Sequence, residues 1–117
     1  MNETTESYVG IDVSKKILDT AIGQTGDLWQ SANDRKGIAD IVTRLEALQP
    51  ALIVVESTGG LEIRLLTALF EAKLPFCRVH PGRVREFARS VGLLGKTDRL
   101  DARLLARFAQ AVKPPVT

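Results

Sequence analysis

The chain has 117 residues, of which 44% are hydrophobic and 26% are charged; this is typical of one globular domain with a sizeable core and excludes a disordered segment. Its apolar runs are short and its start, MNETTES, is polar, so we expect no membrane segment, no secretory signal and a cytoplasmic location. Lysine and arginine number eight against eleven acidic residues in 1–79 but eight against three in 80–117, which makes the last third a candidate nucleic-acid contact.

The first third of the chain shows the alternation of β-strands. Residues 8–14, YVGIDVS, place apolar side chains at every second position. Two further runs, at 17–23 and 27–32, are separated by the turn sequence QTGD. We therefore expect an antiparallel meander of three strands.

After residue 32 the pattern changes to alternating helices and strands. Asn33 or Asp34 can cap a helix that stops at Pro50, and the continuous apolar run ALIVVES at 51–57 is typical of a strand buried on both faces. The remaining predicted elements are a helix carrying Leu61 to Leu69, a strand at 75–79, a helix from about Pro81, a glycine-containing loop at 91–96 and a helix from about Asp98 to Val112.

This order predicts the α/β class, with a mixed sheet of about five strands flanked by helices. In such a sheet the first strand can lie parallel to the strand at 51–57. Asp12 and Glu56 come near the ends of these two strands, so both carboxylates are expected at the carboxyl edge, where open α/β sheets bind ligands.

The last predicted helix adds two more acids. At 100° per residue, Asp101 falls among the apolar side chains of Leu104, Leu105 and Phe108, with Asp98 three residues earlier. An unpaired carboxylate on a core-facing stripe is costly. If this helix crosses the carboxyl edge of the sheet, four acidic groups converge there.

Four neighbouring carboxylates require cations to stay ionised together. Oxygen ligands favour Mg²⁺ or Mn²⁺, and two such ions about 4 Å apart would suit displacement at phosphorus. Simpler interpretations remain open. Asp98 and Asp101 together resemble an N-cap followed by an acidic third residue, and Asp12 and Glu56 could each end a strand at the solvent boundary.

Three segments, GIDVSK, VVESTG and GKTDRLDA, resemble the N-terminal domain of the DEDD transposases of the insertion-sequence 110 family, which are related to the Piv invertase. The resemblance covers about residues 7–112 and implies a RuvC-like domain of the ribonuclease H-like fold. The acidic tetrad of the family matches Asp12, Glu56, Asp98 and Asp101, which the resemblance implies to be catalytic metal ligands.

The resemblance also implies an activity and partners. These are Mg²⁺-dependent cleavage and rejoining of DNA strands during transposition, assemblies of more than one subunit and, in some members, a guide RNA. We expect residues 1–112 to form the RuvC-like domain and 113–117 to begin a linker to a C-terminal domain with a serine nucleophile. Ser14, Ser57 and Ser90 do not match that serine, so the whole reaction is not expected of these 117 residues.

Basic side chains near the acidic set are the expected phosphate contacts. They are Lys15, Arg83, Arg85, Arg89, Lys96, Arg99 and Arg103. Two other functions stay open. One is a RuvC-like Holliday-junction resolvase that uses the same acids, and the other is a non-catalytic nucleic-acid-binding or oligomerisation module.

Overall fold

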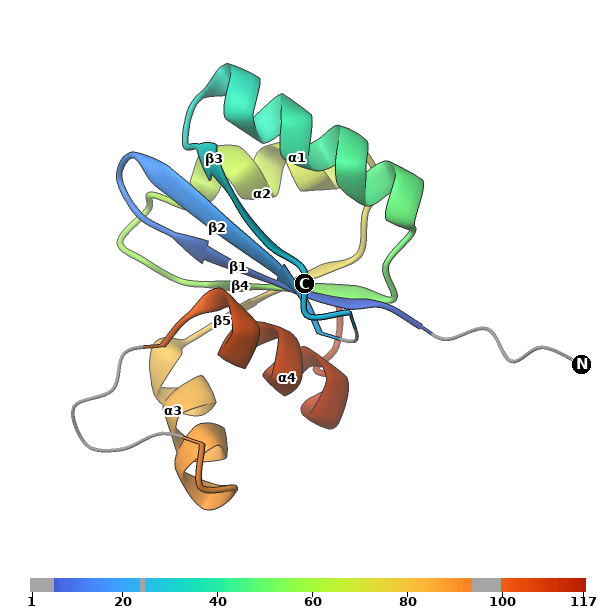
Figure 1. Cartoon of the computed structure of the whole chain (residues 1–117). Helices are drawn as coiled ribbons and strands as arrows, with labels where there is room; N and C mark the ends of the chain where they lie inside the picture. The colour runs from blue at the N-terminus through green and yellow to red at the C-terminus, as the bar shows by residue number, and fades with distance from the viewer. Residues whose placement is uncertain (1–5, 24, 94–99) are drawn as a thin grey trace, which may run out of the picture.

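A computed structural model describes residues 6–23, 25–93 and 100–117 (Figure 1). One mixed sheet of five strands has the strand order β3-β2-β1-β4-β5. The number of strands and the place of β1 beside β4 are as the sequence predicts. Its strands are β1 (Tyr8–Val13), β2 (Ile17–Ile22), β3 (Leu28–Ala32), β4 (Leu52–Glu56) and β5 (Phe76–Val79). The helices are α1 (Arg35–Leu48), α2 (Ile63–Glu71), α3 (Pro81–Ser90) and α4 (Ala102–Val112).

The sheet lies between two helical layers, with α1 and α2 on one face and α3 and α4 on the other (Figure 1). Alternation along the strands supplies both cores. Val9 and Ile11 of β1 pack with the apolar residues of α1 and α2, whereas Tyr8 packs with α4. The interior strand β4, between β1 and β5, contributes to both cores, which explains its continuous apolar sequence.

The predicted meander and the predicted parallel pairing are both confirmed. β2 pairs antiparallel with β1 and β3, while β1 runs parallel to β4. β4 in turn runs parallel to β5. The carboxyl ends of the three parallel strands β1, β4 and β5 therefore lie at one edge of the sheet.

Gly10 allows α4 to lie close to β1. A Cβ atom at this position would collide with backbone atoms of Ala102 and Ala106 and with the side chain of Leu105. Ala21, opposite Gly10 on β2, packs against Ala102 and Ala106 in a small cluster of alanines. Small residues on both elements thus bring the first turn of α4 over the centre of the sheet.

The start of α4 corrects the sequence interpretation of Asp101. The helix begins at Ala102, so Asp101 precedes it as the N-cap and is exposed, instead of lying among the core-facing residues. Its side chain accepts a hydrogen bond from the backbone N–H of Leu104 at 2.9 Å. The helical periodicity does not apply to Asp101, because its backbone is extended and not helical. The expected start of the helix at Asp98 lies outside the described residues.

The end of the described chain returns to the sheet. Lys113 ends α4 in a left-handed conformation, and the Thr117 N–H donates a hydrogen bond to the Phe76 carbonyl at 2.8 Å. Cys77 is buried in β5. Among the residues that the structure describes, no helix has the length and apolar character needed to cross a membrane.

Candidate metal centre

Asp12 and Glu56 lie side by side at the carboxyl edge of the sheet. Ile11 is in register with Val55 on the parallel strand, so the next residues along the two strands are Asp12 and Glu56. Both continue the alternation that faces α3 and α4. The predicted juxtaposition of these two carboxylates is present in the structure.

A pocket of about 320 Å³ opens at this edge. Both carboxylates line it, together with two basic residues from the set expected to contact phosphate. The lining residues are Asp12, Val13, Ser14, Lys15, Glu56, Thr58, Leu61, Arg85 and Leu100. The pocket therefore combines anionic and cationic side chains at the ends of β1 and β4.

The electrostatics of the pocket centre on Glu56. Burial raises the pKa of Glu56 above its ordinary value, the negative charge of Asp12 raises it further, and the Arg85 guanidinium opposes both effects. The Oε2 atom of Glu56 is buried and accepts no hydrogen bond from the described residues. A buried acceptor beside a second carboxylate favours binding of a cation.

Of the predicted tetrad, the described residues bring Asp12 and Glu56 together. Asp101 directly follows Leu100, which lines the pocket, but its exposed side chain caps α4. Within residues 6–23, 25–93 and 100–117, no three His, Cys, Asp or Glu side chains cluster closely enough to hold a metal ion. Asp98 lies outside the described residues. The fit to a divalent cation therefore rests on Asp12 and Glu56.

The expected phosphate contacts occupy different positions. Lys15 and Arg85 line the pocket, and Arg83 stacks over the ring of Phe108, with its guanidinium carbon 5.5 Å from the ring centroid. Arg89 in the last turn of α3 and Arg103 on α4 are exposed. Lys96 and Arg99 lie outside the described residues.

Two acidic residues near this edge were not predicted from the sequence. Asp19 on β2 is directly opposite Asp12 in the antiparallel pair, so a further acid shares its face of the sheet. The register of the predicted meander could have revealed it. Glu62 is completely buried beside the loop that follows Glu56, and no local pattern distinguishes it from an ordinary polar residue.

Comparison with known proteins identifies the family. A model of the DEDD transposases of the IS110 type, described as transposase, matches residues 9–115. The chain is also similar to the pilin gene-inverting proteins of Moraxella lacunata and Moraxella bovis, with 27% and 26% identity over 118 residues. These matches cover 95% of this chain and 36% of each relative, so the chain spans about a third of their length.

The fold has a counterpart among solved structures. T. thermophilus RuvC, solved in complex with a Holliday junction substrate, matches with a TM-score of 0.61 at 16% identity, over 92% of this chain and 96% of that chain. At this identity the similarity shows the fold alone. The chain therefore belongs to the IS110 family of DEDD transposases, and it has the RuvC-like, ribonuclease H-like fold.

Proposed function

We propose that this chain is a metal-dependent catalytic domain that cleaves and transfers DNA strands in transposition or inversion. Membership of a transposase family and similarity to two gene-inverting proteins support DNA as the substrate. The observation that carries the proposal is the pairing of Asp12 with Glu56 at one pocket, where the Glu56 Oε2 atom is buried and accepts no hydrogen bond from the residues that the structure describes. That arrangement fits Mg²⁺ or Mn²⁺, which accept carboxylate ligands.

In this proposal Asp12 and Glu56 hold the cation, and the family resemblance implies Asp98 and Asp101 as its further ligands, for which the exposed Asp101 side chain would turn toward the pocket. One carboxylate oxygen of Asp101 accepts the capping hydrogen bond, which leaves the other available to a metal ion. When bound, divalent metal would supply Lewis-acid stabilisation of the charge that develops at phosphorus.

The basic residues of the pocket have a separate role in the proposal. Lys15 and Arg85 line the same pocket as the carboxylates, so they can bind phosphate oxygens of DNA and orient the strand. Arg83, Arg89, Lys96, Arg99 and Arg103 would contact phosphates farther along the strand.

Metal binding gives a direct test. Because the folded pocket binds the ion and the unfolded chain does not, Mn²⁺ at 100 times its dissociation constant should stabilise the wild type by about 2.7 kcal/mol. Asp12→Asn should remove most of this effect. The matched control is Asp40→Asn, which changes an exposed acid on α1, on the opposite face of the sheet.

The measurement is thermal unfolding over a Mn²⁺ titration, with circular dichroism to confirm that each variant is folded. We expect Asp40→Asn to respond to Mn²⁺ as the wild type does. A wild-type melting temperature that does not change with Mn²⁺, with or without a DNA duplex, would contradict the proposal. That result combined with salt-sensitive DNA binding would instead favour a non-catalytic nucleic-acid-binding module.

A further inference from the structure

Glu62 is a fully buried carboxylate outside the predicted tetrad. Its side chain has 0% exposure, at the residue before the first turn of α2. Burial alone raises the pKa of Glu62, but its own backbone N–H, that of Thr58 and the charge of Arg78 together hold the pKa below its ordinary value. A buried charge is stable only where neighbouring groups compensate it. The contacts of Glu62 therefore favour its ionised carboxylate over the protonated acid.

One half of this pairing involves the loop that follows β4. The Oε1 atom of Glu62 accepts hydrogen bonds from the backbone N–H groups of Thr58 at 3.2 Å and Gly60 at 3.1 Å. Gly59 and Gly60 both have positive φ angles, which glycine adopts without strain. The loop therefore folds around the carboxylate, and Glu62 determines the path of the chain directly after Glu56.

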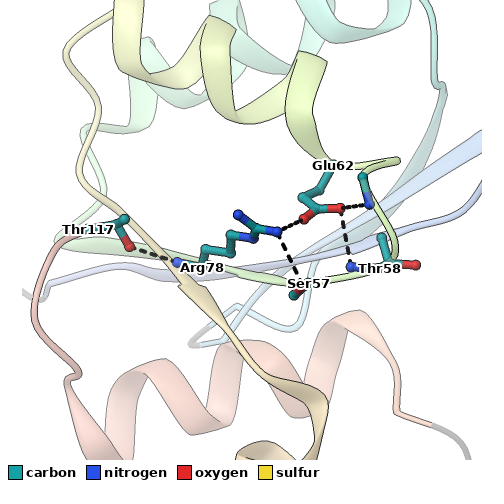
Figure 2. Close-up of polar contacts among 6 residues, drawn as sticks. Ser57, Thr58, Glu62, Arg78 and Thr117 are labelled. Carbon is teal, nitrogen blue, oxygen red and sulfur yellow. Dashed lines mark hydrogen bonds and ion pairs between the residues drawn. The ribbon is translucent and has the colours of Figure 1, made fainter.

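The other half of the pairing comes from β5. The Arg78 Nη2 atom lies 2.9 Å from Glu62 Oε2 and also donates a hydrogen bond to Ser57 Oγ at 3.4 Å. Figure 2 shows the resulting network, in which the Arg78 guanidinium contacts both Ser57 and Glu62. The Arg78 backbone N–H is held in turn by Thr117 Oγ1 at 2.9 Å.

The network adjoins the candidate metal centre. Ser57 follows Glu56 directly and donates its backbone N–H to the Val79 carbonyl at 2.8 Å. Thr58 lines the same pocket as Asp12 and Glu56. A movement of the loop at Thr58 would therefore alter the wall of the pocket beside Glu56.

We propose that Glu62 and Arg78 are positioning residues that lock the Ser57–Gly60 loop and thereby hold Glu56 in the orientation needed to bind metal. This inference rests on the proposed metal site. Groups that orient metal ligands through hydrogen bonds commonly change metal affinity by about 10-fold to 100-fold when they are replaced. Neither residue would itself touch the metal or DNA.

The test uses Glu62→Gln, which preserves the shape of the side chain and removes its charge. Mn²⁺ affinity is measured on the 117-residue chain by electron paramagnetic resonance, and loop order is measured without metal by hydrogen exchange at Thr58 and Gly60. We expect metal binding to weaken by about 10-fold and loop exchange to accelerate by about 10-fold. Glu46→Gln, an exposed change on α1, is the matched control and should alter neither.

Arg78 provides a second pair of variants that does not depend on the first. Arg78→Met should weaken Mn²⁺ binding as Glu62→Gln does, whereas Arg78→Lys should restore part of the affinity because it keeps a positive charge beside Glu62. Melting curves identify any variant that fails to fold. If Glu62→Gln is unfolded, the comparison of the two folded Arg78 variants decides the question.

The outcomes separate the two proposals. Wild-type chain that binds no Mn²⁺ would refute the proposed function and the positioning role together. If the wild type binds Mn²⁺ and Glu62→Gln and Arg78→Met bind it with the same affinity, the positioning role alone would be overturned. This holds even if both variants have lower melting temperatures than the wild type. If amide hydrogen exchange at Thr58 and Gly60 is the same in Glu62→Gln as in the wild type, Glu62 does not hold the loop, and the inference is overturned whether or not metal binds.

Discussion

Asp101 has a structural role that can be separated from its proposed role as a metal ligand. Asp101→Ala removes the acceptor of the 2.9 Å hydrogen bond from Leu104 at the start of α4. Loss of such a cap costs about 1 kcal/mol, which for a domain of this size lowers the melting temperature by about 4 °C. Asp101→Asn keeps an acceptor oxygen and loses only the charge at the helix terminus, at a cost of about 0.3–1 kcal/mol.

The assay measures thermal unfolding of both variants with and without Mn²⁺. Without metal, we expect Asp101→Ala to melt below Asp101→Asn. With metal, both should lose much of the wild-type stabilisation, because neither retains the charged ligand. The control is Asp34→Ala, since Asp34 caps α1 through the Gly37 N–H at 2.8 Å on the other face of the sheet. It should cost similar stability and leave the Mn²⁺ effect intact.

Two results would refute this reasoning. Equal melting temperatures for Asp101→Ala and the wild type without metal would show that the capping hydrogen bond contributes nothing. Full Mn²⁺ stabilisation in both Asp101 variants would remove Asp101 from the proposed ligand set and leave it as an N-cap only.

Three further predictions concern the sheet, the pocket and DNA. In denaturant unfolding, Gly10→Ala should destabilise the fold by about 1–3 kcal/mol. Gly23→Ala is the control and should be tolerated, because the new Cβ would meet its nearest atom at 3.5 Å. Equal losses of unfolding free energy in the two variants would contradict the close packing of α4 on Gly10. Because the pKa of Glu56 is raised in the folded state, the protonated carboxyl stabilises the fold at low pH, and this stabilisation is lost as pH rises through the pKa. The free energy of unfolding of the wild type should therefore fall relative to that of Glu56→Gln over this pH range. A difference in free energy between the two proteins that does not change with pH would argue against burial of Glu56 beside Asp12. Arg85→Ala with Arg89→Ala should weaken DNA binding and reduce the salt slope by about 0.9 per lost phosphate contact; an unchanged slope in fluorescence anisotropy would exclude these contacts.

Local sequence patterns determined most of the secondary structure and part of the site. Alternation at 8–14 and the apolar run at 51–57 predicted β1 and β4, because side chains of a strand alternate between its faces. The parallel pairing then required Asp12 and Glu56 to meet, since parallel strands end at the same edge of a sheet. These two acids could therefore be placed together without any knowledge of side-chain packing.

Tertiary structure decided the features that depend on single contacts between distant segments. Helical periodicity assigned Asp101 to the core face of a helix expected from about Asp98, but the structure begins that helix at Ala102 and leaves Asp101 exposed as its N-cap, which accepts a hydrogen bond from the Leu104 N–H. Glu62 looks like any polar residue before a helix, but the loop N–H groups of Thr58 and Gly60 and the approach of Arg78 from β5 keep its buried charge paired. Periodicity reports which face of an element is apolar, whereas the pairing of a buried charge depends on which elements the fold brings within hydrogen-bond distance.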